Sequence, residues 1–381
     1  MITNKLISIL TCSTIVMTSA VQADQQENDF SWSGDFRLRL ESDWNSQKSD
    51  GSERESRDRA RIRLRLNGNY QLSENTSFSA RMRTGSNTSQ QSPHYTISDF
   101  NGNDKGDFDV GLDKWFIRHN QALGDVKTST WLGRNALNIW KNNEMFWDDD
   151  ATVSGIGTQF ESEFNNSSGN KAKLGGSAGY AALPVGLTQY SGTMTFAQLY
   201  YQSSFNQTDI KMSSGLFDMN ADADDIDGQK LLLNNGSLDH RIWLSSIRIQ
   251  LPEWPITVSF DYMQNILSYS AQELTLAKDD DKNGFVGSIG IKKLFGQPSL
   301  SFKYTYADIG ALSVNSSYSQ DDWMRWGSAI ETRASDFSGH EFRLKYKMNT
   351  YGNILFRLYS VDAKSTIEDG NRFRVDWNIK F

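Results

Sequence analysis

The end of the chain, Arg372-Phe-Arg-Val-Asp-Trp-Asn-Ile-Lys-Phe381, is the stretch that decides the fold. Polar and apolar side chains alternate strictly along it. A period of two places all the apolar side chains on one face of a β-strand and all the polar ones on the other. The strand therefore separates a polar surface from an apolar one. Strands of membrane β-barrels do this, although a strand of a soluble β-sandwich shows the same pattern.

A second stretch, Arg57-Asp-Arg-Ala-Arg-Ile-Arg-Leu-Arg-Leu66, repeats the pattern near the other end of the chain. Its odd-numbered positions from 57 to 65 are all arginine, and its even-numbered positions from 60 to 66 are all apolar. An arginine at the middle of a bilayer costs roughly 2–4 kcal/mol, so a row of arginines has to face water. We expect this row to line the lumen of a barrel. The alternatives are a solvated sheet face, or an inward ionic cluster that plugs a small barrel.

Segments of the same period, bounded by turn residues, recur sixteen times. The predicted strands are 34–41, 59–72, 76–84, 107–119, 127–137, 155–163, 171–183, 193–205, 210–218, 240–250, 256–266, 284–294, 299–307, 340–348, 353–361 and 371–381. Short turns alternate with longer polar loops, and all five prolines fall in connections, as a closed hydrogen-bond ladder requires. The alternation slips phase near Trp115, Gln198 and Ser246. The predicted fold is all-β: a transmembrane antiparallel up-and-down β-barrel of about 16 strands.

The first 23 residues have the pattern of an export signal. A basic start precedes the apolar stretch Leu6–Met17, and Val21-x-Ala23 forms a cleavage pattern. An uncleaved anchor is the alternative, but this stretch is shorter than the roughly 20 residues that a spanning helix needs. We expect cleavage before Asp24 and one barrel domain over residues 24–381. The expected location is the outer membrane of a Gram-negative cell, reached by Sec export through the periplasm.

The chain is polar and acidic overall, with a mean hydropathy of -0.57 and a formal charge of -7. Its basic residues nevertheless concentrate on the strands from the two ends of the chain, which become neighbours when a barrel closes. The basic side chains of this predicted wall are Arg37, Arg39, Arg57, Arg59, Arg61, Arg63, Arg65, Arg81, Arg83, Arg343, Lys345, Lys347, Arg357, Arg372, Arg374 and Lys380, and the acidic ones are Asp35, Glu41, Glu341 and Asp376. The wall therefore carries a net charge of about +12, and an aqueous passage along such a wall favours anions.

The segment 138–150, Asn-Ile-Trp-Lys-Asn-Asn-Glu-Met-Phe-Trp-Asp-Asp-Asp, is the third long loop. Its carboxylates, Glu144, Asp148, Asp149 and Asp150, follow strands that lie opposite the basic wall in chain order. The loop resembles the third loop of general porins, which folds inward and sets carboxylates against an arginine ladder. By that resemblance it is the candidate constriction loop. An ordinary external loop is the alternative.

The segment Trp131-Leu-Gly-Arg134 and the arginine row together resemble the putative porin and alginate-export families. The resemblance implies an outer-membrane porin that passes small anionic solutes or acidic oligosaccharides. An export pore for an anionic polysaccharide is the second interpretation. Ending a strand on Phe381 resembles the terminal assembly signal of such barrels. The implied partners are outer-membrane lipid and lipopolysaccharide, the barrel assembly machinery, anionic solutes and two further copies in a homotrimer, but not nucleic acid.

We expect neither catalysis nor a metal or cofactor. Ser338, Asp336 and His340 are close in sequence, but no nucleophile motif accompanies them, as a barrel hydrolase would need. The acidic clusters 222–227 and 279–281 partly resemble calcium loops, but neither supplies the distal Glu of a full site. Solvated loop charge is the favoured interpretation of both clusters.

Aromatic residues near strand ends predict girdles at the two membrane interfaces. The candidates are Trp32, Tyr70, Trp131, Trp243, Trp254 and Trp377. A second group lies in the loops, where the side chains either stack on sugars or anchor the loops. Its members are Trp140, Phe146, Trp147, Trp323 and Trp326.

Overall fold

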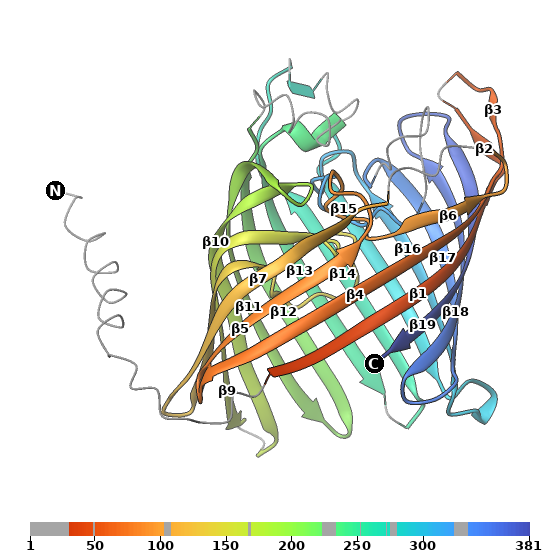
Figure 1. Ribbon diagram of the computed structural model, residues 1–381. Helices are drawn as coiled ribbons and strands as arrows, with labels where there is room; N and C mark the ends of the chain where they lie inside the picture. The colour runs from red at the N-terminus through yellow and green to blue at the C-terminus, as the bar shows by residue number, and fades with distance from the viewer. Residues whose placement is uncertain are drawn as a thin grey trace.

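The computed structural model describes residues 30–48, 50–102, 108–166, 169–222, 234–251, 253–271, 273–274, 280–323 and 334–381. Within these residues, sixteen long antiparallel strands close into one barrel, with the first strand paired to the last (Figure 1). The predicted fold class is therefore confirmed. The predicted leader lies outside the described residues.

Each predicted strand corresponds to one strand of the barrel wall. The wall consists of β1 (Phe30–Trp44), β4 (Arg57–Ser73), β5 (Thr76–Thr84), β7 (Val110–Leu123), β8 (Val126–Ala136), β9 (Thr152–Asn165), β10 (Lys171–Val185), β11 (Gln189–Phe205), β12 (Thr208–Asn220), β13 (His240–Leu251), β14 (Ile256–Asn265), β15 (Asn283–Lys292), β16 (Leu300–Ile309), β17 (Phe337–Lys347), β18 (Gly352–Ala363) and β19 (Asp369–Lys380). The smaller elements are β2 (Ser46–Gln47), β3 (Glu53–Arg54), β6 (Tyr95–Asp99), η1 (Asn234–Ser237) and η2 (Leu294–Gly296). Of the described helical segments, none is long and apolar enough to cross a membrane.

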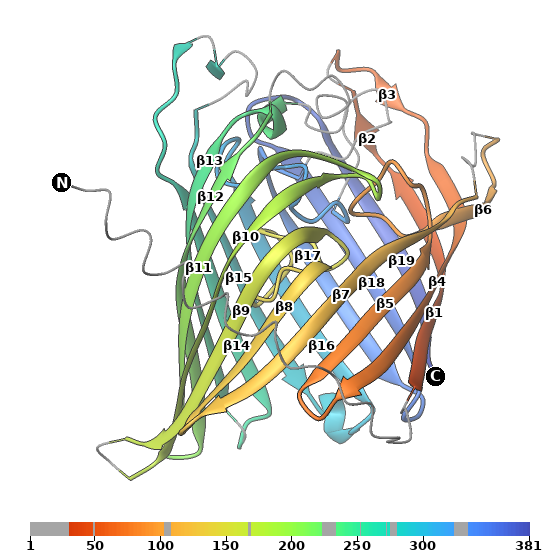
Figure 2. The ribbon, with the colours of Figure 1, turned by 60° about the vertical axis from the view of Figure 1, so that its left-hand side comes forward.

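Short turns join the strands at one end of the barrel, which we call the turn end, and longer connections join them at the other, the loop end (Figure 2). The start of β1 and the end of β19 meet at the turn end. There the backbone of Phe381 pairs with that of Gly34, with N···O distances of 2.7 and 3.0 Å, and closes the seam between β1 and β19. The alternation slip predicted near Trp115 coincides with a register shift between β5 and β7.

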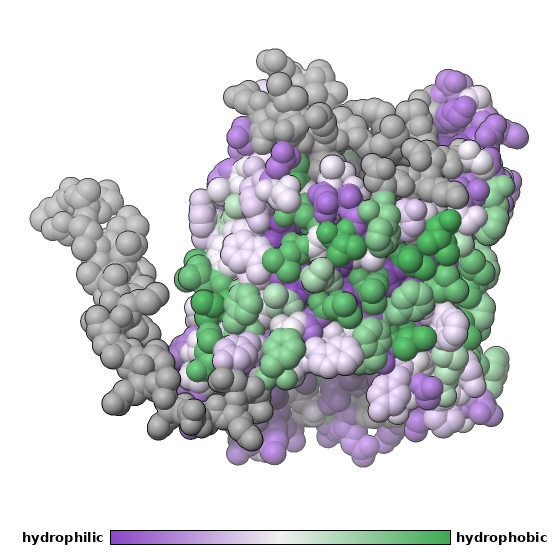
Figure 3. Space-filling model, in the orientation of Figure 1, coloured by the Kyte–Doolittle hydropathy of each residue, from purple (hydrophilic) through white to green (hydrophobic). Residues whose placement is uncertain are grey.

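The strand alternation separates an apolar exterior from a polar inner wall along β1 and β4. Leu40 and Leu66 are 50% and 40% exposed on the outside, whereas Arg39 and Arg59 are buried inside. On the face that Figure 3 shows, a belt of apolar side chains crosses the middle of the barrel, and polar residues gather above and below it. Such a belt is the surface that lipid contacts in a membrane barrel.

Trp131 departs from the predicted aromatic girdles. Trp32, Trp243, Trp254 and Trp377 are well exposed on the barrel, but Trp131 is only 1% exposed and lies in the interior cluster. Its indole lies against Gly157 of β9, where a Cβ atom would approach the ring within 2.7–2.8 Å. The prediction for Trp131 is wrong because a glycine on the neighbouring strand makes room for the ring inside.

The loop half of the lumen is packed with apolar side chains, which the sequence analysis did not predict. This cluster joins inward-facing residues of β7–β18 to two loops that fold into the barrel. Its largest members are Trp131, Phe146, Trp147, Phe196, Phe217, Tyr318, Trp323, Phe337 and Tyr359. The inner wall is thus polar on the arginine side and apolar on the opposite side.

Candidate functional site

Three connections fold into the lumen and meet there. We call them L2 (residues 85–94), L3 (residues 137–151) and L7 (residues 310–323). L3 leaves the wall between β8 and β9 and reaches β4 at one end, where Asp150 pairs with Arg65 at 2.6 Å and with Arg63 at 3.6 Å. Its other end reaches β11, β13 and β14 on the far side of the barrel. L3 therefore crosses the lumen.

Polar contacts hold the far end of L3 against the inner wall. The amide of Gln198 on β11 brackets the backbone of Trp140, accepting from its N–H at 2.7 Å and donating to its carbonyl at 2.9 Å. Asn142 donates to Asp261 on β14 at 2.9 Å and accepts from Arg248 at 2.9 Å. Asn143 also donates to Asp261. A carboxylate that accepts two amide donors holds the loop through charge-assisted hydrogen bonds.

L7 is a second inward loop, and it packs directly on L3. Asp148 N–H donates to the carbonyl of Tyr318 at 2.7 Å, and Gln320 N–H donates to that of Glu144 at 3.0 Å. The rings of Trp147 and Tyr318 stack with centroids 5.0 Å apart. L2 adds a third contact, because the side-chain amide of Gln90 donates to the carbonyl of Ser317 at 2.7 Å.

The predicted arginine row lies on the inner wall and is extensively neutralised. Strand pairing sets Arg39 opposite Arg61 and Arg357 opposite Arg374, and like charges in directly opposite positions destabilise a sheet. Carboxylates of the wall and of the inward segments intervene. The pairs are Arg39–Asp376 (2.6 Å), Arg57–Asp99 (2.8 Å), Arg63–Asp35 (2.7 Å), Arg65–Asp35 (2.8 Å), Arg81–Asp113 (2.5 Å), Arg83–Asp113 (3.8 Å), Arg372–Asp43 (2.5 Å), Arg374–Glu41 (2.5 Å), Arg61–Glu41 (3.9 Å) and Arg59–Glu41.

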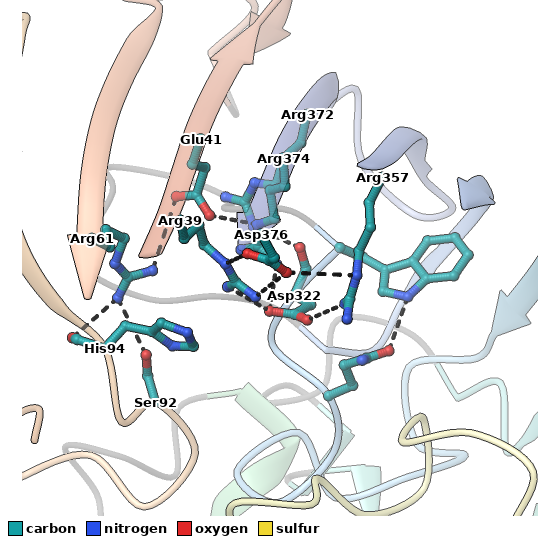
Figure 4. Close-up of polar contacts among 12 residues, drawn as sticks. Arg39, Glu41, Arg61, Ser92, His94, Asp322, Arg357, Arg372, Arg374 and Asp376 are labelled. Atoms are coloured by element: carbon teal, nitrogen blue, oxygen red, sulfur yellow. Dashed lines mark hydrogen bonds and ion pairs between the residues drawn. The ribbon is translucent and has the colours of Figure 1, made fainter. Parts of the chain in front are cut away.

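Asp322 of L7 lies among arginines from three strands (Figure 4). Its carboxylate accepts from Arg357 at 2.9 Å, from Arg39 at 3.4 Å and from Arg374. Arg372 donates to its backbone carbonyl at 2.7 Å. Burial raises the pKa of Asp322, but the guanidinium groups of Arg374, Arg39 and Arg357 outweigh burial and hold the pKa well below its usual range. Asp322 is therefore ionised.

The net charge of the wall is smaller than the predicted value of about +12. The count of about +12 included four carboxylates, whereas Asp43, Asp99, Asp113, Asp150 and Asp322 also pair with its arginines. Three of these five come from connections or from β6, and chain order gave no register by which to place them beside the arginines. The arginine row is thus a mixed ionic network.

A second set of inward cations has no carboxylate oxygen within 4 Å among the described residues. It includes Arg37, Lys114, Lys211, Arg248 and Lys303. Three of them, Lys211, Arg248 and Lys303, lie on β12, β13 and β16, which the sequence analysis left out of the basic wall. The period-2 pattern of those strands places the three side chains inward, so their inward position could be predicted from the sequence although the predicted basic wall did not include these strands. Carboxylates such as Asp261 and Glu341 act on these cations from farther away, but none of the described carboxylates forms an ion pair with them.

Three cavities lie beside L3 or on its turn-end side. One, of about 160 Å³, separates L3 and L7 from the wall of β15–β17 and is lined by Lys141, Glu144, Asp149, Lys303 and Arg343, among others. A second, also of about 160 Å³, lies beneath Trp140 between Lys211 and Arg248. A third, of about 550 Å³, opens toward the turn end and is lined by residues including Lys127, Gln159 and Tyr200. L3 leaves space along its far side, while its near side meets the arginine row.

The predicted loop carboxylates differ in their surroundings. Asp150 meets the arginine row; burial raises its pKa, but Arg65 and Arg63 hold it below its usual range. Asp149 pairs with Lys141 at 2.7 Å. Burial, together with the neighbouring Asp149, raises the pKa of Glu144 to about 7. Burial and the nearby Glu144 raise the pKa of Asp148 well above its usual range.

The other predicted site residues have varied environments. Arg343 pairs with Glu341 at 2.8 Å, and Lys345 is exposed toward the turn end of β17. Arg134 of the Trp131–Arg134 segment donates to the carbonyls of Gly186 and Leu187, which fastens the tip of the β10–β11 hairpin to the barrel rim.

Of the aromatic loop residues, Phe146, Trp147 and Trp323 are buried in the interior cluster, which fits the loop-anchoring interpretation. Trp140 is half-buried, with Lys211 and Arg248 over its ring at 5.1 and 5.4 Å. Trp326 lies outside the described residues.

Two of the three residues weighed as a hydrolase site, His340 and Asp336, have other partners. His340 Nδ1 lies 2.7 Å from the hydroxyl of Tyr304, and Asp336 accepts from the backbone and side chain of Ser365. Of the acidic clusters, Asp281 pairs with Lys364 at 2.6 Å, while residues 223–227 and 279 lie outside the described residues. Among the described residues no three metal-ligating side chains gather.

Comparison with known proteins supports the fold and the resemblance. Residues 51–208 match the family described as "Putative porin". The structure is similar to Pseudomonas putida OprB (TM-score 0.52, 11% identity, 92% of each chain). It is also similar to Pseudomonas aeruginosa OprD (TM-score 0.46, 13% identity, 95% of this chain and 99% of that one) and to a mutant porin of Rhodopseudomonas blastica (TM-score 0.48, 11% identity, 93% and 100%). A search of curated proteins finds no match.

The family match and the sixteen-stranded barrel confirm the porin resemblance inferred from the sequence. Together they indicate a porin-like outer-membrane channel fold.

Proposed function

We propose that this protein is a diffusion channel of the Gram-negative outer membrane that favours small anionic solutes. The observation that carries the proposal is the set of inward cations without carboxylate partners, Arg37, Lys114, Lys211, Arg248 and Lys303. Fixed charges that line a narrow aqueous passage select ions of the opposite sign. Because most of the arginine row is paired, the excess positive charge lies mainly with these residues.

The passage in this proposal runs along the far side of L3. A solute entering from the loop end reaches the space between L3, L7 and β15–β17, where Lys303 and Arg343 face Glu144 and Asp149. It then enters the wider cavity toward the turn end. Cations and carboxylates on opposite sides of a gap produce a transverse field, and Lys303, which has no carboxylate oxygen within 4 Å among the described residues, gives that field its preference for anions.

Vesicle swelling with purified protein tests this function. Swelling should be faster in gluconate than in a neutral sugar of similar size. The variant Lys303→Gln should lose much of that difference while keeping the neutral rate. Lys173→Gln is the matched control, since Lys173 is paired with Glu161 at 2.9 Å and Glu163 at 2.7 Å. Equal rates for both solutes in the unmodified protein would refute the anion preference.

A further inference from the structure

The arginines around Asp322 share some of their wall carboxylates with other arginines. Arg39, Arg372 and Arg374 each have a wall partner, which is Asp376 at 2.6 Å, Asp43 at 2.5 Å and Glu41 at 2.5 Å respectively. Arg357 has none as close, since its Nε lies 3.9 Å from Asp376 and 4.0 Å from Glu341. Without L7, these four guanidinium groups would have four wall carboxylates, two of which are shared with other arginines: Glu41 with Arg59 and Glu341 with Arg343.

Asp322 supplies a further carboxylate to these arginines from a loop that is not part of the wall. It belongs to L7, and its carboxylate bridges Arg39, Arg357 and Arg374, which come from three different strands (Figure 4). Several guanidinium groups converging on one carboxylate form a strong oxyanion site, because their planar N–H groups match the carboxylate geometry. The Asp322 side chain is 16% exposed, so the site is not sealed from the lumen.

We propose that this cluster, Arg39, Arg357, Arg372 and Arg374, is a binding site for a carboxylate-bearing solute, and that Asp322 is a tethered competitor that a solute displaces. The proposal deepens the anion-channel function and rests on it. A solute carboxylate would take the position of the Asp322 carboxylate, and the tip of L7 would move away from the wall. The cluster and Asp322 together favour solutes that present a free carboxylate and slow the passage of anions that cannot take the place of the Asp322 carboxylate.

The tether sets the size of the effect. A group held on a short loop competes at an effective concentration in the millimolar range or above. If Asp322 occupies the cluster about nine-tenths of the time, the apparent affinity for a free carboxylate falls about tenfold, because only the vacant fraction binds. Removing the Asp322 charge should restore that affinity.

Succinate block of single channels in planar bilayers measures this competition. Asp322→Asn should lower the succinate concentration for half-block about tenfold, with chloride as the background anion. Asp321→Asn is the neighbouring control, because Asp321 makes no ion pair among the described residues and burial, together with Asp322, raises its pKa. Adding Arg357→Gln to Asp322→Asn should abolish the gain. The proposal would be overturned if succinate blocked the unmodified protein, Asp322→Asn and Asp321→Asn equally, or if it blocked Asp322→Asn more weakly than the unmodified protein.

A second measurement needs no change at Asp322. Trp323 is buried against Phe337 and Tyr359, so displacement of the L7 tip should alter its fluorescence. Succinate should produce a spectral shift in the unmodified protein that Trp323→Phe lacks and that glucose does not cause. No succinate-dependent difference would contradict displacement. An anion-selective channel without these succinate effects would sink this inference alone, whereas a channel without anion preference would sink the proposed function.

Discussion

An arginine placed on the outer, lipid-facing side of β4 should lower the free energy of unfolding more than a change on the inner side. Leu66 lies near the middle of β4, is 40% exposed, and pairs with Met82, which is 49% exposed on the same surface. An arginine at mid-bilayer costs roughly 2–4 kcal/mol. Leu66→Arg should therefore lower the folding equilibrium constant by a factor of roughly 30 to nearly 1,000, at about 1.4 kcal/mol per factor of ten.

The matched change inside the barrel should cost far less. Arg63 donates to Asp35 at 2.7 Å, and Asp35 retains Arg65 at 2.8 Å when Arg63 is replaced. Losing one of two donors to a carboxylate costs at most about 1.5–3 kcal/mol, and the cost is reduced because Arg63→Gln keeps some hydrogen-bonding capacity and Asp150 keeps its pair with Arg65 at 2.6 Å. Urea unfolding in phospholipid vesicles measures both variants, with Leu66→Ala as the control for lost apolar contact. If Leu66→Arg is as stable as the unmodified protein while Arg63→Gln does not fold, the inside and outside faces are inverted.

Three further predictions concern the loops and the interior. Asp150→Ala removes charge-assisted contacts worth about 1.5–3 kcal/mol, so L3 should loosen and single-channel conductance should rise; unchanged conductance would contradict L3 as the constriction. The raised pKa of Glu144, about 7, gives L3–L7 packing a stabilisation that is complete below its ordinary pKa of 4.5 and is lost as the pH rises through about 7. Conductance should accordingly increase from pH 5 to pH 8, and Glu144→Gln should flatten this profile; a profile that the substitution leaves intact would exclude Glu144 as its source. Gly157→Ala should crowd Trp131 and cost about 1–3 kcal/mol in urea unfolding, whereas Gly287→Ala, with open space around it, should cost little.

The strands could be predicted from the sequence because each one sits between lipid and the lumen. That arrangement imposes a period of two, and residues such as Leu66 outside and Arg63 inside follow it. Trp131 breaks the pattern, because its inward position depends on Gly157 across the strand pair. A side chain's space inside a barrel is set by residues that are near in the fold but not in the chain.

The constriction was only partly predictable. The carboxylates of L3 resembled a known arrangement, but of the four only Asp150 meets the arginine row. The inward fold of L7 left no periodic signal, because loops have none, and Asp322 lies 35 residues before the nearest of its arginine partners in the chain. The unpaired Lys211, Arg248 and Lys303 were visible as inward positions of their strands. Their importance emerged only when the pairing of the arginine row was known.

The reversal potential of the unmodified protein in a potassium chloride gradient across a planar bilayer tests the central claim most directly. The account predicts steady single-channel currents and a reversal potential whose sign reports chloride as the more permeant ion. A membrane that stays closed, or a reversal potential of the opposite sign, would contradict it.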